Sequence, residues 1–350
     1  MNIKDLLKIT VERKASDLHL VVGIPPTLRI DGLPSPLTEE ALTDEKIEEL
    51  VAELLTDEQK ELLSVNKEID LSFAYENEAR FRINVYHEKR HLAAALRCLP
   101  LKIRSIDELS LPKICRQFTQ LNQGFILVTG PTGHGKSTTL AAMLEEINRN
   151  RRCHIVTIED PIEYVFSHKK AIISQRELHA DTHSWNIALR SCLREDPDVV
   201  FIGEMRDYET IASALTIAET GHLVFATLHT NSAAQTVDRI VDVFPPHQQE
   251  QVRMQFSSTL EAILSQRLIP CLSGGRIPAS EILVATQAVR TTIREGKTHL
   301  IDNIIQTSAE VGMVTLETDL ARLVKIGKIS LETAKAWALR PEELMRQIRK

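Results

Sequence analysis

The chain has 350 residues, of which 43% are hydrophobic and 26% charged, and it carries a formal net charge of −6 at neutral pH. This composition predicts a soluble globular protein with enough chain for two domains, and it excludes a mainly disordered one. The acidic balance argues against a protein that binds DNA or RNA regardless of sequence, because such affinity comes from clustered Lys and Arg. We therefore expect no nucleic-acid partner.

No targeting or membrane-spanning segment is apparent. Charges interrupt the first 20 residues every two or three positions, and no stretch approaches the roughly 20 apolar residues of a spanning helix. The five cysteines are spread singly, without the paired spacing of a zinc site. We expect a cytoplasmic protein with reduced thiols.

Residues 1–98 are predicted to form a first domain. Short strands are expected at "DLHLVV" and "PTLRIDG", a helix between Ala41 and Leu63, and then strands at "IDLSFAY", "RFRINVY" and "LAAALRCL". The short connections "ENEA" and "HEKRH" favour hairpins. The pattern predicts a small antiparallel sheet with one or two helices, followed by a connector over 99–112 that Pro100 and Pro112 bracket.

The stretch 113–270 has a different pattern. Strongly apolar runs of strand length ("FILVTG", "HIVTIED", "DVVFIGE", "LVFATL") alternate with segments of helical spacing. Strands this apolar are typical of a parallel sheet that helices cover on both faces, which predicts an α/β domain. Residues 271–350 are expected to be a mostly helical C-terminal region.

A phosphate-binding loop follows the first of these strands. The segment "GPTGHGKS" matches G-x-x-x-x-G-K-[ST] between a buried strand and an amphipathic helix, which is the context that the motif requires. The expected nucleotide-binding residues are Gly130, Pro131, Thr132, Gly133, His134, Gly135, Lys136, Ser137 and Thr138.

The chemistry of this loop predicts ATP and Mg²⁺. Glycines let backbone N–H groups surround the β-phosphate, and the helix N-terminus adds partial positive charge. Lys136 is expected to bridge the β- and γ-phosphates, and the Ser137 hydroxyl to ligate Mg²⁺. His134 occupies a crowded position, so we expect its side chain to point outward.

Carboxylates are expected beside this loop. Glu204 stands at the carboxyl end of the strand "VVFI", and Gly203 takes the position before it, where an Asp is usual. Glu204 is therefore predicted to act on the metal alone, through water. The alternative interpretation is a surface Glu that opens the following helix.

Two further groups are candidates for the reaction. "TIEDPIEY" concentrates Glu159, Asp160 and Glu163, which can bind the nucleotide or orient the attacking water, although an acidic surface turn is an alternative. His222 and His229 flank the strand "LVFATL". His229 could sense the γ-phosphate, whereas either histidine alone is also typical of a core or an interface.

These stretches, in this order, resemble the secretion-superfamily hexameric ATPases, and specifically the PilT-type type IV pilus retraction ATPases. The resemblance covers nearly the whole chain: "ASDLHL", "RIDG", the Walker A loop, "TIEDPIEY", "LREDPDVVFIGEMRD", "ETGHLVFATLHTNSAAQTVDRIVDVFP" and "AVRTTIRE". It implies an α/β fold in which an N-terminal PAS-like α+β domain precedes a RecA-like P-loop ATPase domain with C-terminal helices. It also implies a ring of six subunits.

The resemblance assigns roles to several residues. Glu163 would activate water, Glu204 would be the Walker B glutamate, and His222 with His229 would form the His-box pair. Arg82 and Arg97, on the polar face of the first domain's sheet, would reach the phosphates when the domains close. Closure would then gate hydrolysis.

"AVRTTIRE" at 288–295 resembles a helix that the family needs for retraction and not for hydrolysis. Val289 and Ile293 are expected to pack inward, which leaves Arg290, Arg294 and Glu295 to interact outward. Thr291-Thr292 stands where the family's helix motif usually has Asn-Leu. In the phosphate loop, His134 stands where the family generally has Ser.

The resemblance implies a motor that hydrolyses ATP to retract pili, working peripherally at the cytoplasmic face of the inner membrane. Its expected partners are an inner-membrane pilus platform protein and a paralogous retraction ATPase. A PilU-like accessory ATPase and a pilus assembly or type II secretion ATPase are alternatives, and a short N-terminal region without a tetracysteine insert argues against the last two. A nucleic-acid motor and a non-hydrolysing switch are further alternatives.

Overall fold

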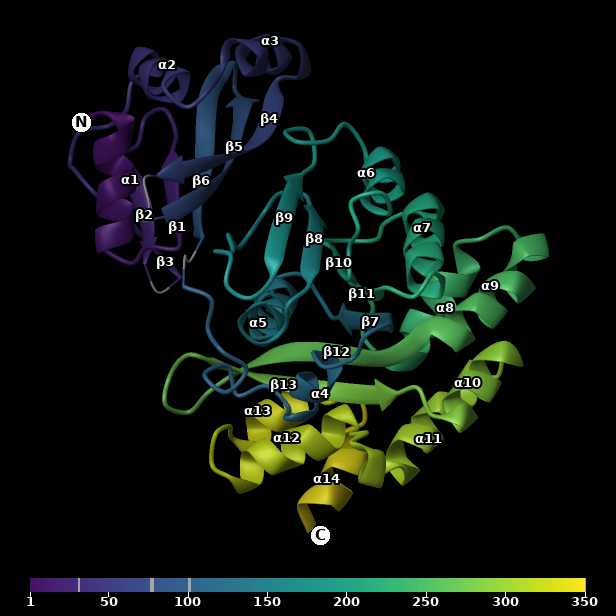
Figure 1. Ribbon diagram of the computed structural model, residues 1–350. Helices are drawn as coiled ribbons and strands as arrows, with labels where there is room; N and C mark the ends of the chain where they lie inside the picture. Colours follow the sequence, from purple (N-terminus) through teal and green to yellow (C-terminus); the bar gives the residue numbers. More distant parts are fainter. Residues whose placement is uncertain (31, 76–78, 100–101, 350) are drawn as a thin grey trace. The chain divides into compact units, whose positions relative to one another are not determined.

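The structure is a computed structural model that describes residues 1–30, 32–75, 79–99 and 102–349 (Figure 1). It divides into two compact units, each with its own hydrophobic core: unit 1 comprises 1–102 with 161–165, and unit 2 comprises 103–160 with 166–350. Asp31 of "RIDG", residues 76–78 of the expected hairpin connection and Pro100 lie outside the described residues. The domain boundaries at 98, 112 and 270 stay predictions.

Unit 1 contains an antiparallel sheet that has six strands in the described residues, in the order β3-β2-β1-β6-β5-β4. The strands are β1 Asp17–Leu20, β2 Thr27–Ile30, β3 Leu33–Pro36, β4 Glu68–Tyr75, β5 Ala79–Glu88 and β6 His91–Leu99. Along β5, Phe81, Ile83 and Val85 are fully buried, whereas Arg82 stays partly exposed. The expected alternation is confirmed.

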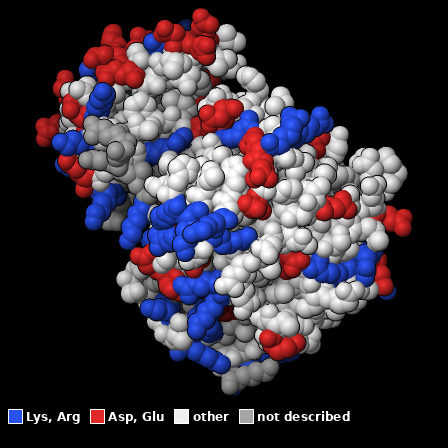
Figure 2. Space-filling view, viewed as in Figure 1, with Lys and Arg blue, Asp and Glu red and all other residues white. Residues whose placement is uncertain are grey.

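The helices of unit 1 are α1 Ile3–Glu12, α2 Asp44–Ala52 and α3 Asp57–Asn66. The single helix expected between Ala41 and Leu63 is therefore two helices. Thr56 starts the second one, because its side chain accepts a hydrogen bond from the Gln59 backbone while the Gln59 side chain accepts one from Thr56. Acidic side chains gather over α2 and α3 (Figure 2).

Unit 2 contains a sheet with seven strands in its described residues, in the order β13-β12-β7-β11-β10-β8-β9. The strands are β7 Gly124–Thr129, β8 His154–Glu159, β9 Ile172–Glu177, β10 Val199–Ile202, β11 Leu223–Leu228, β12 Leu260–Pro270 and β13 Arg276–Val284. All pairs are parallel except β12 with β13. The expected α/β class and its four apolar strands are confirmed, whereas β9, β12 and β13 were not expected, and β13 lies in the region expected to be mostly helical.

Helices flank this sheet and continue to the C-terminus. They are α4 Ile114–Phe118, α5 Lys136–Asn150, α6 Trp185–Cys192, α7 Tyr208–Glu219, α8 Ala233–Asp242, α9 Pro246–Thr259, α10 Gln287–Arg294, α11 Ile301–Thr307, α12 Leu316–Lys325, α13 Leu331–Trp337 and α14 Pro341–Arg349, with short 3-10 turns at Thr298–Leu300 and Ala309–Val311. Helices α12 to α14 pack on β12 and β13 around a second apolar cluster that includes Ile269, Leu320 and Leu344. Among the described residues, no helix combines the length and the apolar character needed to cross a membrane.

Candidate functional site

The site of interest lies at the carboxyl edge of the parallel strands of unit 2. Strands β7, β8, β10 and β11 run parallel in one sheet, so the residues that follow them meet at one edge. These are the loop 130–135 after β7, Asp160 after β8, Gly203-Glu204 after β10 and His229 after β11. Ligands of open α/β sheets bind at this edge.

Two glycines give the loop after β7 its shape. Gly130 has a φ of 141°, and a Cβ added there would come within 2.3 Å of the Gln266 carbonyl oxygen. Gly135 has a φ of 81° and forms the N-cap of α5, which begins at Lys136. A side chain at either position would strain the backbone, so the loop needs these glycines to bring its amide groups around a ligand.

The Lys136 ammonium group lies over this loop. Its Nζ donates to the carbonyl oxygens of Gly130 and Pro131 at 2.8 and 3.1 Å, and it lies 3.5 Å from Nδ1 of His229. The Thr132 hydroxyl is 3.2 Å from the same ring nitrogen. His229 thus contacts the cation that the motif assigns to the phosphates.

Glu204 joins this group through His229. Its Oε1 lies 3.0 Å from His229 Nε2, and its Oε2 accepts a hydrogen bond from Arg206 Nη2 at 3.0 Å. Burial raises the pKa of Glu204, but the hydrogen bond from Arg206 and the charge of His229 outweigh it, so the pKa is lowered overall. Glu204 is therefore a charged carboxylate beside the loop.

Glu159 and Asp160, at the end of β8, lie in different surroundings. Glu159 is buried, and its Oε1 accepts hydrogen bonds from Thr157 at 2.7 Å and Gln175 at 3.2 Å. Asp160 is exposed. The pKa of Arg206 is raised, chiefly by its hydrogen bond to Glu204 and to a smaller extent by the charge of Asp160, so Asp160 adds negative charge near Arg206.

The structure does not bring His222 to this edge within the chain. It precedes β11, and its Nδ1 lies 3.0 Å from the Ile217 carbonyl oxygen and 3.1 Å from the Thr220 hydroxyl. Six strand residues separate it from His229, a length of about 20 Å. Its role toward a nucleotide stays a prediction.

Glu163, Arg82 and Arg97 belong to unit 1. Arg82 on β5 stands directly opposite Arg97 on β6, and Arg97 Nε donates to Asp17 at 3.0 Å. Like charges facing each other across a sheet are unfavourable, and the Asp17 carboxylate offsets part of this repulsion. The roles of these three residues stay predictions.

Steric contacts account for Gly203 in place of an Asp. A Cβ added there would lie 3.3 Å from the Cα of Glu159 and 3.4 Å from the carbonyl oxygen of Ile158. A side chain at this position would therefore push the ends of β10 and β8 apart.

The expectation that His134 points outward is wrong. Its Nδ1 accepts a hydrogen bond from the Leu268 backbone N–H at 3.1 Å, and its ring lies against Trp337 with centroids 5.5 Å apart. The partly buried side chain thus packs on β12 and α13, because these elements cover that side of the loop.

Helix α10 corresponds to "AVRTTIRE". Val289 and Ile293 are fully buried, as expected. The expectation for Arg290 is wrong: it donates to the carbonyl oxygens of Ser257 and Ser258 at 3.0 and 2.9 Å, and to Glu261 at 2.7 Å. Arg290 therefore fastens α10 to the end of α9.

Sequence reasoning missed two side chains of this site. Gln266, on β12, is buried; its Nε2 donates to the His134 carbonyl oxygen at 2.8 Å, and its Oε1 accepts from Thr139 at 2.7 Å. The polar pair Ser265-Gln266 inside an apolar run was the available signal. Arg206 carried no signal beyond its place two residues after Glu204.

The donor set fits Mg²⁺. No group of three or more His, Cys, Asp and Glu side chains suited to a metal ion occurs in the described part of the chain. Mg²⁺ keeps most of its waters and needs only one or two protein oxygens besides the phosphates. The Ser137 hydroxyl in the first turn of α5 can supply one such oxygen, and Glu204, whose two oxygens contact His229 and Arg206, would act through a water.

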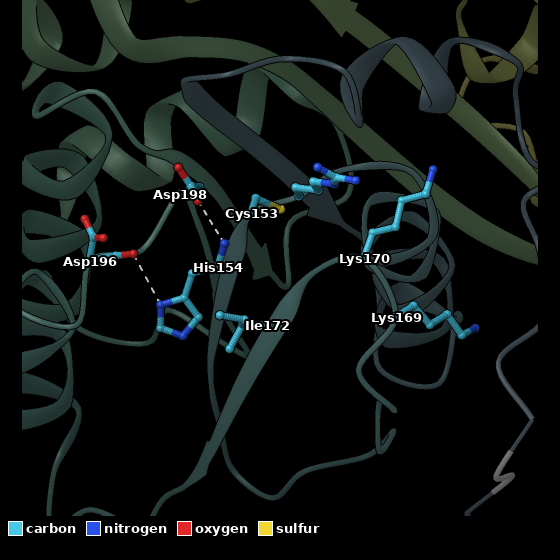
Figure 3. A pocket seen from close by; sticks show the side chains of 8 residues that line it. Cys153, His154, Lys169, Lys170, Ile172, Asp196 and Asp198 are labelled. Atoms are coloured by element: carbon cyan, nitrogen blue, oxygen red, sulfur yellow. Dashed lines mark hydrogen bonds between the residues drawn. The ribbon is translucent and has the colours of Figure 1, made fainter.

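A shallow pocket of about 600 Å³ lies at the opposite edge of the sheet (Figure 3). Its lining residues are Arg152, Cys153, His154, Lys169, Lys170, Ile172, Asp196 and Asp198. His154 and Ile172 are the first residues of β8 and β9, so the pocket opens at the amino ends of the strands. It is therefore separate from the phosphate loop.

Comparisons with known proteins show which family the chain is similar to. A family model described as "Type II/IV secretion system protein" matches residues 63–336. The type IV pilus retraction ATPase PilT of Pseudomonas aeruginosa is 46% identical over 342 residues, which cover 98% of this chain and 99% of that protein. The type IV pilus ATPase PilU of the same organism is 38% identical over 97% of this chain and 89% of its own length. A crystal structure of the pilus retraction motor PilT with bound ADP has a TM-score of 0.92 and 46% identity and covers 99% of both chains.

Proposed function

The chain belongs to the family of type II/IV secretion system proteins, and on that premise we propose that it is an ATP-hydrolysing motor that powers the retraction of type IV pili. It is an ATPase of this family. The observation that carries the proposal is the group formed by Lys136, His229 and Glu204 at the phosphate loop. In this group, His229 contacts both Lys136, the cation expected to bind the phosphates, and the charged carboxylate of Glu204.

Each residue of the group has a proposed task. The amides of the loop and Lys136 bind the β- and γ-phosphates, while Ser137 and Glu204 hold Mg²⁺, which would neutralise charge on those phosphates. Thr132, Pro131, Glu159 and Asp160 line or support the nucleotide. His229 senses the terminal phosphate because it touches both Lys136 and Glu204.

Unit 1 supplies the remaining proposed tasks. Glu163 orients the attacking water, and Arg82 and Arg97 neutralise charge that develops on the phosphates.

We propose that the motor is a ring of six that works at the cytoplasmic face of the inner membrane. There it would turn an inner-membrane platform protein and cooperate with a paralogous ATPase.

The replacement Glu204→Gln tests the hydrolytic assignment. An amide at this position cannot carry the negative charge that the site requires, so ATP turnover is expected to fall at least about 100-fold, while ATP binding persists. The exposed α9 residue Glu250 offers the matched control Glu250→Gln, which should leave turnover unchanged. Equal turnover in wild type and Glu204→Gln would favour a non-hydrolysing switch.

Deletion of the gene separates the retraction motor from its relatives. The retraction proposal predicts cells with abundant surface pili that do not retract. Loss of pili would transfer the assignment to an assembly ATPase. Retraction that persists with reduced force would favour a PilU-like accessory role, which the 38% identity to PilU keeps as the second candidate.

A further inference from the structure

His134 connects the phosphate loop to two segments that are distant in sequence. Its ring nitrogen Nδ1 accepts the hydrogen bond from Leu268, its carbonyl oxygen accepts the one from Gln266, and its ring lies against Trp337. Leu268 and Gln266 belong to β12, whereas Trp337 is the last residue of α13. Both elements belong to unit 2, as the loop does.

Trp337 in turn belongs to the C-terminal helices. It packs against the apolar cluster that β12 and β13 form with α12 to α14. Ser330 caps the N-terminus of α13 by accepting a hydrogen bond from the Thr333 backbone at 3.0 Å. The loop therefore touches the C-terminal helices directly, through one side chain.

The hydrogen bond from Leu268 requires a neutral imidazole. A ring nitrogen that accepts a hydrogen bond carries no proton, so the proton of neutral His134 is on Nε2. Protonation would place a hydrogen on Nδ1 facing the Leu268 N–H and remove this bond. The ring would then have to turn away from β12.

The surroundings of the ring favour its neutral form. Burial lowers the pKa of His134, and so do the positive charges of Arg267 on β12, Lys136 on α5 and Arg276 on β13. A base whose pKa is lowered by folding stabilises the structure above its unfolded pKa of about 6.5 and loses that contribution as the pH falls. The contact is thus complete at neutral pH and lost on acidification.

We propose that His134 is a positioning residue that ties the phosphate loop to α13, so that the affinity for ATP depends on the C-terminal helices and on the neutral form of this histidine. The proposal rests on the proposed binding of ATP at this loop. A loop fastened at His134 holds its amides in the binding geometry before the nucleotide arrives, which lowers the cost of binding. The C-terminal helices could then weaken binding by pulling Trp337 away.

Three variants test this role. His134→Asn places an amide oxygen near the position of Nδ1 and cannot take up a proton, whereas His134→Ala and Trp337→Ala each remove one side of the link. The measurements are KM and kcat for MgATP between pH 5.5 and 8. Lys136→Ala is the control that separates failure of the loop to bind ATP at all from failure of the link.

The expected result at pH 7.5 is a KM raised about five-fold in His134→Ala, since one neutral hydrogen bond is lost, with kcat little changed. Trp337→Ala should raise KM in the same direction. The double variant should raise KM no further than His134→Ala alone, because His134→Ala already removes the contact with Trp337. His134→Asn keeps an acceptor for the Leu268 N–H but loses the ring contact with Trp337, so at this pH its KM should rise no more than that of Trp337→Ala.

Because the pKa of His134 is lowered in the folded protein, KM in wild type should rise at pH values below the ordinary imidazole pKa of about 6.5, and there more steeply than in His134→Asn. Protonation of ATP itself affects both proteins equally, so the difference between their pH profiles reports on His134. A wild-type KM in His134→Ala, or identical pH profiles of wild type and His134→Asn, would overturn the proposal.

Fluorescence provides a readout that does not depend on ATP. The sequence has two tryptophans, so a Trp185→Phe background leaves Trp337 as the single emitter. A protonated imidazole quenches a neighbouring indole, so Trp337 emission should fall on acidification and should not do so with His134→Asn. Emission that titrates identically in both proteins would contradict contact between the two rings.

Discussion

Arg206 lowers the pKa of Glu204, and its removal gives a test by pH. Its hydrogen bond and charge lower the pKa of Glu204 against the effect of burial. In Arg206→Ala only burial and His229 remain, so the pKa of Glu204 should rise. The acid limb of the pH–rate profile of ATP hydrolysis should move to higher pH.

The acid limb should move to higher pH because the reaction requires Glu204 as a charged carboxylate. Activity is present above the pKa of Glu204 and is lost as the pH falls through it, so a higher pKa removes activity at a higher pH. Arg206→Lys, which keeps a cation, should shift the limb less. An unchanged limb in Arg206→Ala would mean that protonation of Glu204 does not limit the reaction.

Gly203 is the second residue whose surroundings make a clear prediction. Gly203→Asp would restore the carboxylate that is usual at this position, but its Cβ would press on the backbone of Glu159 and Ile158. We expect a loss of about 1–3 kcal/mol in the free energy of unfolding, without a gain in turnover. Denaturant unfolding measures this, and an Asp variant of wild-type stability and higher turnover would contradict the account.

Strand β12 supports the loop through Gln266. Gln266→Met keeps the length of the side chain but leaves the His134 carbonyl oxygen and the Thr139 hydroxyl without this partner. The unfolding free energy should fall by about 1–3 kcal/mol and KM for ATP should rise. Gln251→Met, on the exposed side of α9, is the matched control. Unchanged KM and stability in Gln266→Met would show that Gln266 on β12 does not support the loop.

The elements of the central sheet differ in how far the sequence predicts them. Strands β7, β8, β10 and β11 are almost wholly apolar, because helices cover both of their faces, and the sequence predicts them. Strand β9 reads "IISQRE" and β12 contains "SQR", since Gln175 on β9 contacts Glu159 on β8 and Gln266 on β12 contacts the loop. Their periodicity is correspondingly weak, and both were missed.

The candidate site also contains residues that the sequence predicts and residues that it does not. The motif located Lys136 and Ser137, and strand ends located Glu204 and His229, because local sequence determines both. Gln266 and Trp337 come 132 and 203 residues after His134, and no local pattern links residues so far apart. The contacts of the His134 side chain depend on these two segments, so the sequence alone could not show them.

The two units of the molecule are expected to act together in catalysis. Arg82→Ala and Arg97→Ala should each lower kcat, by up to about 10³-fold, because a cation that neutralises phosphate charge contributes mainly in the transition state. KM should change less. Arg13→Ala, at the exposed end of α1, is the control. A wild-type kcat in both variants would show that Arg82 and Arg97 do not take part in the reaction.

Binding of a nucleoside triphosphate at Lys136 is the claim on which every other role depends, and calorimetric titration of the folded protein with a non-hydrolysable ATP analogue and Mg²⁺ tests it most directly. Wild type should show saturable binding, and affinity should be lowered at least ten-fold in Lys136→Ala, which loses the cation that faces the phosphates. Absence of binding by wild type, or equal affinity in the two proteins, would contradict it.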